Sequence, residues 1–149
     1  MARVRALADS GSISVTASPT TKTLLSLTAP ANQALALKRF ILSCEGVAPT
    51  DKPILVEIGT VTGGTSAGVT ERQIAGPTVT LQGVGLTYSA EPTWTAYYAF
   101  YVHLQSGYEK VFQLAEDEWV FLNSIVAVRV TNPSGNSTTN VRLVMEWEE

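Results

Sequence analysis

The segment Val141-Arg142-Leu143-Val144-Met145-Glu146-Trp147-Glu148 decides the fold class of this chain. Its large apolar side chains stand at every second position, and most of its charged side chains fall between them. An amphipathic helix would repeat its apolar positions every three to four residues, whereas a strand with one buried face repeats them every two. The segment is therefore predicted to be a half-buried β-strand.

The same period of two recurs at residues 125–131, 54–58 and 94–104. In the last of these segments two faces are expected, one with Ala96, Tyr98, Phe100, Val102 and Leu104, the other with Thr95, Tyr97, Ala99, Tyr101 and His103. Both faces carry aromatic residues. This composition indicates that the outer face of the strand is also covered, and predicts a subunit contact there.

Residues 34–44 change phase in the middle of the segment. Leu35 and Leu37 keep one alternation, while Phe40 and Leu42 keep the opposite one. A β-bulge at Lys38-Arg39 would reconcile the two halves. A helix is the competing interpretation, but the run is short and flanked by turn residues, which favours a strand.

Further strands are expected at residues 12–16, 23–28, 78–82, 109–114 and 118–122, separated by glycine and proline turns. Residues 59–68 are rich in glycine but lack the Gly-Lys-Ser/Thr ending of a phosphate-binding loop, so they are interpreted as a flexible loop between strands. The chain contains 40 β-branched Val, Ile and Thr residues. Together these features predict an all-β sandwich or barrel of about eight to ten antiparallel strands.

A length of 149 residues fits one domain. Residues 1–10 are polar and lack a period of two, so the organisation expected is an N-terminal arm at 1–10 followed by a sandwich at 11–149. The arm is either a frayed terminus or a segment that becomes ordered on a neighbouring subunit.

The net charge is −3, and charged residues make up only 15% of the chain, against about 25% in ordinary soluble domains. The 45% hydrophobic content excludes intrinsic disorder, and ten scattered basic residues disfavour nucleic-acid binding. No apolar run is long enough for a transmembrane helix, and no secretory signal is evident, so synthesis in the cytoplasm is expected. The single cysteine, Cys44, lies in an apolar run and is interpreted as a small buried hydrophobe.

Catalysis and cofactor binding are poorly supported. The only histidine, His103, has no nucleophile motif to accompany it, and one His with one Cys cannot form a metal cluster. The consecutive acids Glu116, Asp117 and Glu118 are interpreted as a solvated turn rather than a catalytic pair. What remains is a surface with Trp94 and several tyrosines, including Tyr88 and Tyr108, which suits a protein interface or a platform for sugar rings.

The order of the predicted strands and turns along the chain resembles that of a known family. Residues 23–32 lead into a strand that ends in Ser43-Cys44-Glu45-Gly46, and residues 54–60 follow with a Gly/Thr loop. A turn at Gly107-Tyr108-Glu109 and strands at 118–122 and 125–131 precede a closing strand that ends in Met145-Glu146-Trp147-Glu148-Glu149. From residue 12 to 149 this arrangement resembles the short jelly-roll proteins of tailed bacteriophage virions, and among them the capsid decoration (cement) proteins.

The resemblance implies a jelly-roll β-sandwich that binds the outside of an expanded bacteriophage head as a homotrimer. The implied partner is the major capsid protein, with no enzymatic activity, cofactor, nucleic acid or membrane involved. On this hypothesis Arg3, Val4, Arg5 and Leu7 of the arm reach the capsid or a neighbouring subunit, and Tyr97, Tyr101 and His103 lie at a subunit interface. A tail-associated or lectin-like carbohydrate-binding module stays open as the alternative, and an enzyme is a third, weaker interpretation.

Overall fold

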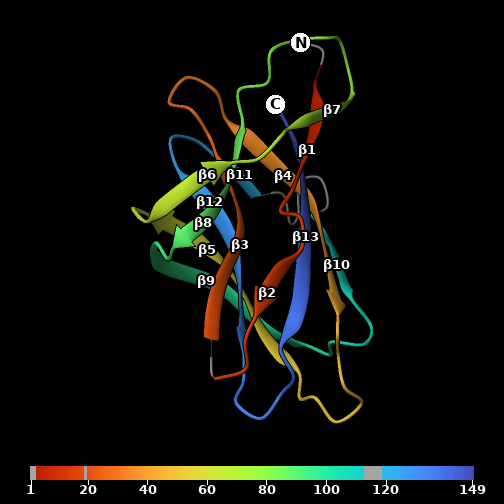
Figure 1. The fold of residues 1–149 in the computed structure, drawn as a ribbon. Helices are drawn as coiled ribbons and strands as arrows, with labels where there is room; N and C mark the ends of the chain where they lie inside the picture. The colour runs from red at the N-terminus through yellow and green to blue at the C-terminus, as the bar shows by residue number, and fades with distance from the viewer. Residues whose placement is uncertain (1–2, 19, 113–118) are drawn as a thin grey trace.

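The fold is described from a computed structural model that covers residues 3–18, 20–112 and 119–149. These residues form thirteen strands and no helix (Figure 1). The strands are β1 (Arg5–Asp9), β2 (Ile13–Val15), β3 (Thr20–Thr28), β4 (Leu35–Glu45), β5 (Ile54–Thr62), β6 (Thr65–Gly68), β7 (Arg72–Ala75), β8 (Val84–Ala90), β9 (Thr93–Val102), β10 (Tyr108–Val111), β11 (Trp119–Phe121), β12 (Ile125–Asn132) and β13 (Thr139–Glu148).

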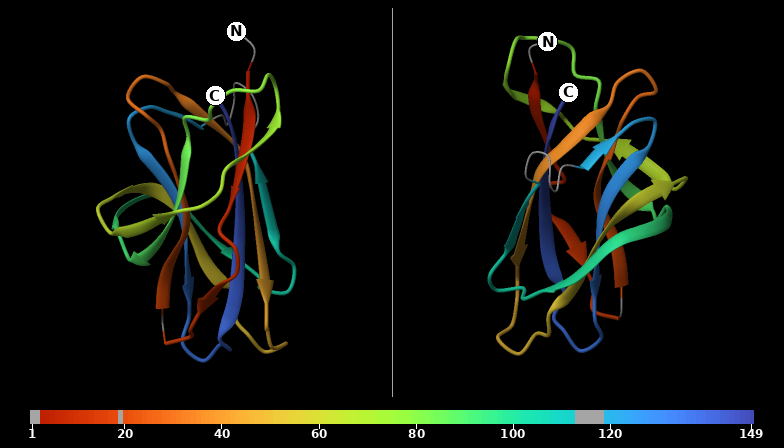
Figure 2. Two further views of the ribbon diagram at one scale, coloured as in Figure 1. Left: turned by 45° about the horizontal axis from the view of Figure 1, so that its top comes forward. Right: turned by 180° about the vertical axis from the view of Figure 1, so that it is seen from behind.

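Two antiparallel sheets pack face to face as a β-sandwich, which confirms the predicted all-β class. One sheet has seven strands in the order β10-β4-β13-β1-β7, with β11 pairing with β4 and β2 pairing with β13. The other has six strands in the order β6-β8-β3-β12-β5-β9. Figure 2 shows the two layers from the side, with both chain ends at the same end of the sandwich.

The decisive segment is the central strand of the seven-stranded sheet. Four apolar residues at alternate positions of β13 are at most 1% exposed and belong to the main core, as the alternation predicts: Val141, Leu143, Met145 and Trp147. Glu146, on the opposite face, is also buried, and it forms ion pairs with Arg39 of β4 and Arg5 of β1. A buried carboxylate is tolerated when opposite charges neutralise it in this way.

The predicted bulge in β4 is confirmed. Glu146 pairs with Arg39 and Trp147 pairs with Leu37, so the register between β4 and β13 shifts by one residue at Lys38. The extra residue lets Leu37 and Phe40, three positions apart, both enter the core. The change of phase in the sequence therefore corresponds to a β-bulge in the strand.

The N-terminal segment differs from the prediction. Residues 5–9 are not an arm outside the sandwich, because β1 lies between β13 and β7 and pairs with both strands (Figure 1). Ala6 and Ala8 are in the core, and small residues at alternate positions gave too weak a pattern for a strand to be predicted. The boundary expected at residue 10 therefore does not separate two structural units.

The segment between β5 and β9 also differs from the prediction. Residues 59–68 are not a single loop, since β5 runs to Thr62, a turn at Gly63-Gly64 reverses the chain, and β6 follows. Residues 78–82 are not a strand: the amide of Gln73 bonds to the backbone at Gly76, Pro77 and Val79, in place of a neighbouring strand. The strand in this region is β8, further along the chain.

Candidate functional site

The strand β9 forms one edge of the six-stranded sheet and is the site's main element (Figure 2). It pairs with β5 along its whole length, and in the described part of the chain no strand pairs with its other side. None of its ten residues is charged. Long uncharged edge strands attract further strands, and proteins usually protect them with charges or prolines. Such a strand suits a surface that is covered in an assembly.

Three tyrosines project from this edge into solvent. Tyr97 is 60% exposed, Tyr98 is 59% exposed and Tyr101 is 73% exposed; His103, just beyond the end of the strand, is exposed as well. The structure thus places the predicted interface residues on one accessible edge. Tyrosine is enriched at protein interfaces because its ring contributes a large apolar area at a small cost in side-chain entropy.

The strict alternation predicted for this strand is wrong at one point. Ile58 pairs with Tyr98 and Gly59 pairs with Ala96, so Tyr97 is an extra residue in the ladder. Both Tyr97 and Tyr98 therefore reach Trp119 of β11, with ring centroids 5.7 and 6.0 Å away. Sequence reasoning assigned Tyr98 to the core face and missed its exposure, because a strand with aromatic residues on both faces gives no signal of a bulge.

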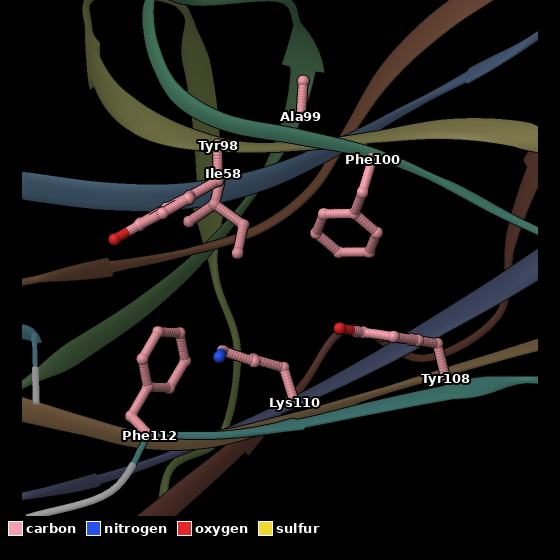
Figure 3. Close-up of a pocket in the computed structure, with 7 residues that line it drawn as sticks. All are labelled: Ile58, Tyr98, Ala99, Phe100, Tyr108, Lys110 and Phe112. Carbon is pink, nitrogen blue, oxygen red and sulfur yellow. The ribbon is translucent and has the colours of Figure 1, made fainter. Parts of the chain in front are cut away.

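Beneath this edge the two sheets enclose an aromatic cavity of about 310 Å³ (Figure 3). Its walls come from β9 and β10 at one side of the sandwich, and Ile58 of β5 lies between them. The closest ring pair is Phe100 with Tyr108, at 4.8 Å between centroids. The Lys110 ammonium points into the same space, 5.5 Å from the centre of the Phe112 ring. These contacts hold β9 and β10 in a fixed relation at the open side of the sandwich.

Trp94 does not form the exposed shelf for sugar rings that the lectin-like interpretation needs. The guanidinium of Arg129 lies over its indole at 4.5 Å, and Glu57 holds that guanidinium through hydrogen bonds of 2.6 and 3.1 Å. The indole N–H donates to the hydroxyl of Thr23 at 3.1 Å. One face of the ring is therefore already covered by the chain's own side chains.

The residues predicted to reach a capsid or a neighbouring subunit are engaged within the chain. Val4 is buried, and its backbone exchanges two 2.9 Å hydrogen bonds with Glu149. Arg3 pairs with Glu148 at 2.9 Å and Arg5 with Glu146 at 3.6 Å, while Leu7 is half-buried on β1. The two arginines and Leu7 remain accessible in part, but Val4 is not available for a partner.

The candidates for catalysis are not brought together in the described residues. His103 is exposed, and its backbone carbonyl accepts hydrogen bonds from the amide and hydroxyl of Ser106. Within residues 3–18, 20–112 and 119–149, no group of three or more His, Cys, Asp or Glu side chains is placed to hold a metal ion. The acidic run Glu116-Asp117-Glu118 lies outside the described residues.

Cys44 is half-buried beside the core, and burial raises the pKa of its thiol to about 11. Because the thiolate is the reactive form, we expect the folded protein to react with Ellman's reagent at pH 8 roughly 100-fold more slowly than the protein unfolded in guanidinium. Equal rates in the two states would contradict the interpretation of Cys44 as an inert hydrophobe.

Compared with known proteins, the chain matches no family model, and no similar curated protein or solved structure is found. None of the residues that the structure describes forms a helix long and apolar enough to cross a membrane.

Proposed function

We propose that this chain is a capsid decoration protein of a tailed bacteriophage, a jelly-roll subunit that assembles as a trimer on the outside of the head and stabilises it. The proposal rests on the resemblance of residues 12–149 to such proteins and on the properties of β9. Its partner is the major capsid protein, and its place in the virion is the capsid exterior. No catalytic group is required for this role.

The strand order supports the jelly-roll assignment. In a jelly roll, eight strands taken in chain order form two sheets, 1-8-3-6 and 2-7-4-5. Taking β1, β3, β4, β5, β9, β10, β12 and β13 as these eight strands gives the sheets β1-β13-β4-β10 and β3-β12-β5-β9, which match the observed orders. On this assignment β6, β7 and β8 are an insertion between the fourth and fifth strands, and β2 and β11 are short additions.

The observation that carries the assembly proposal is the uncharged edge of β9 with its exposed tyrosines. A decoration protein strengthens a shell through wide contact, and a surface with little charge forms contacts without a large cost of desolvation. In a ring of three, each subunit uses one patch to bind the next copy and a different patch to bind the previous one. Tyr101 and its neighbours would therefore contact a different part of the next copy. A contact of β9 with β9 would instead close as a dimer.

The solution mass tests this proposal. We expect light scattering to give about 48 kDa, three times the 15.9 kDa of one chain. The variant Tyr101→Glu introduces a charge at the most exposed tyrosine and is expected to give monomers at micromolar concentration with an unchanged circular dichroism spectrum. The matched control is Thr50→Glu, at an exposed position in the β4–β5 loop, which should remain trimeric. A monomeric or dimeric wild-type protein would contradict the trimer.

A further inference from the structure

A second hollow lies at one end of the six-stranded sheet, where the end of β3, the β5–β6 turn and the β11–β12 turn meet. It is open and has a volume of about 660 Å³. Hollows that hold small ligands usually have volumes of about 300–1,000 Å³, so this one has room for one or two sugar rings. It is separate from the aromatic cavity between β9 and β10, which has different lining residues.

The lining is polar without being charged. Five of its side chains carry a hydroxyl or an amide, and one aromatic ring completes the wall: Thr28, Thr60, Thr62, Asn123, Ser124 and Tyr97. Among the described residues no charged side chain lines the hollow. Hydroxyl and amide groups both donate and accept hydrogen bonds, as the hydroxyl groups of a sugar do. An aromatic face beside them provides a surface for the apolar C–H face of a sugar ring.

One polar group of this wall lacks a partner in the structure. The Oγ1 atom of Thr28 is buried and makes no hydrogen bond. A buried polar group left unpaired costs about 1–3 kcal/mol, and threonine can present its hydroxyl in more than one rotamer. Rotation of the Thr28 side chain about χ1 would turn this hydroxyl toward the hollow, where a ligand hydroxyl would give it a partner.

Two other lining residues are held in place before any ligand arrives. Tyr97 packs edge to face on Trp119, with an angle of 88° between the rings, so the orientation of its ring is set by a neighbour. Asn123 has a φ of 48°, a left-handed conformation that is uncommon outside glycine, and its backbone N–H donates to the carbonyl of Pro30 at 3.2 Å. Sparsely populated backbone conformations gather at ligand-binding sites, where the surrounding structure maintains them.

We infer that this hollow binds a neutral saccharide, with a sugar ring stacked on Tyr97 and its hydroxyl groups bonded to the threonine, serine and asparagine side chains. The site differs from the shelf expected at Trp94, whose indole is covered by Arg129. It goes beyond the proposed capsid role, and because that role places Tyr97 at a subunit contact, binding is tested on the monomeric Tyr101→Glu variant as well as on the wild type. A neutral sugar is favoured over an acidic one because no basic side chain among the described residues lines the hollow.

The test starts with labelled protein on an array of neutral and sialylated oligosaccharides, followed by calorimetric titration with the best-bound glycan. We expect neutral glycans to be bound, Tyr97→Ala to weaken binding at least tenfold, and Tyr97→Phe to keep it within about threefold. The control Thr50→Ala changes an exposed residue of the β4–β5 loop that lies outside both the hollow and the proposed subunit contact, so its affinity should match the wild type. Tyr101→Glu should also bind, because the site lies within one chain.

Thr28→Val gives a readout that a purely structural role would not produce. It removes the unpaired hydroxyl, so the melting temperature should rise by a few degrees while glycan affinity falls. Absence of binding to every glycan on the array would overturn the inference. So would binding of sialylated glycans alone, or equal losses in Tyr97→Ala and Thr50→Ala.

Discussion

Deletion of residues 1–10 is expected to prevent folding. The deletion removes β1, which lies inside the seven-stranded sheet, and so leaves residues 144–148 of β13 unpaired along one edge and the whole of β7 without a partner. It also removes Val4, Ala6 and Ala8 from the buried apolar residues and takes Arg5 away from the buried Glu146. Domains are stable by only about 5–15 kcal/mol, and the loss of a paired internal strand exceeds that margin. Circular dichroism and thermal melting of the truncated protein measure the effect.

Deletion of residues 1–3 is the matched control. It leaves β1 intact and removes the exposed side of one ion pair, Arg3 with Glu148, which contributes at most about 1 kcal/mol. This shorter truncation should therefore fold and melt within a few degrees of the full chain. If removal of residues 1–10 left the melting temperature unchanged, the segment would be a separable arm, and the position of β1 in the sheet would be wrong.

Gly59→Ala is expected to have the second large effect. Gly59 lies in β5 opposite the bulge of β9, and a Cβ added there would lie 2.2 Å from the carbonyl oxygen of Thr95. That oxygen belongs to the backbone, so the clash is relieved only if the two strands separate. We expect a loss of about 3 kcal/mol or more in unfolding free energy, and a fall of about 10 °C in melting temperature. On the proposed assembly, separation of β9 from β5 should also weaken the trimer.

Gly68→Ala tests whether the effect belongs to Gly59 itself. Nothing lies within 4 Å of a Cβ built at Gly68, and its φ is outside the left-handed region. The control variant should keep the stability of the wild type, as surface substitutions away from special features usually do within about 0.5 kcal/mol. Urea titration of both variants distinguishes the two positions. Equal stability of the two would contradict the close approach of β5 and β9.

The strands that could be predicted from the sequence are those with one face in the core. In β13 and β12 the apolar residues alternate with others, because one face packs into the main core and the other is less buried overall. The bulge at Lys38 was predictable for the same reason, since the burial phase changes on either side of it. The strands β6 and β7 expose most of their residues, so no alternation marks them. Only their pairing with β8 and β1 makes them strands.

The candidate site could be predicted only in part. The lack of charge in β9 is visible in the sequence, and it leads to Tyr97, Tyr101 and His103, all of which are exposed. The neighbours of these residues could not be predicted, because they depend on the bulge at Tyr97 and on the packing of Trp119 of β11 against it. The hollow near Asn123 combines side chains from four separate parts of the chain, so no residue pattern within a single segment could predict it.

The scarcity of charged residues in this chain is most pronounced along one side of the sandwich. The edge strand β9 has no charged residue. On the same side of the sandwich, β10 and β11 each expose an apolar residue, Val111 and Val120 respectively. On the proposed function this side is covered when subunits assemble. Other charged side chains of the chain form ion pairs away from β9, for example Glu146 with Arg39 and Asp9 with Arg142.

The most direct test of the proposed decoration role is co-sedimentation of the purified protein with expanded heads of the bacteriophage that, on this proposal, encodes it. The proposal predicts saturable binding in multiples of three chains and a higher temperature of head rupture when the protein is bound. The Tyr101→Glu variant should bind more weakly than Thr50→Glu. If the wild-type protein stays in the supernatant at saturating concentration, and rupture of the heads is unchanged by it, the capsid decoration role is wrong.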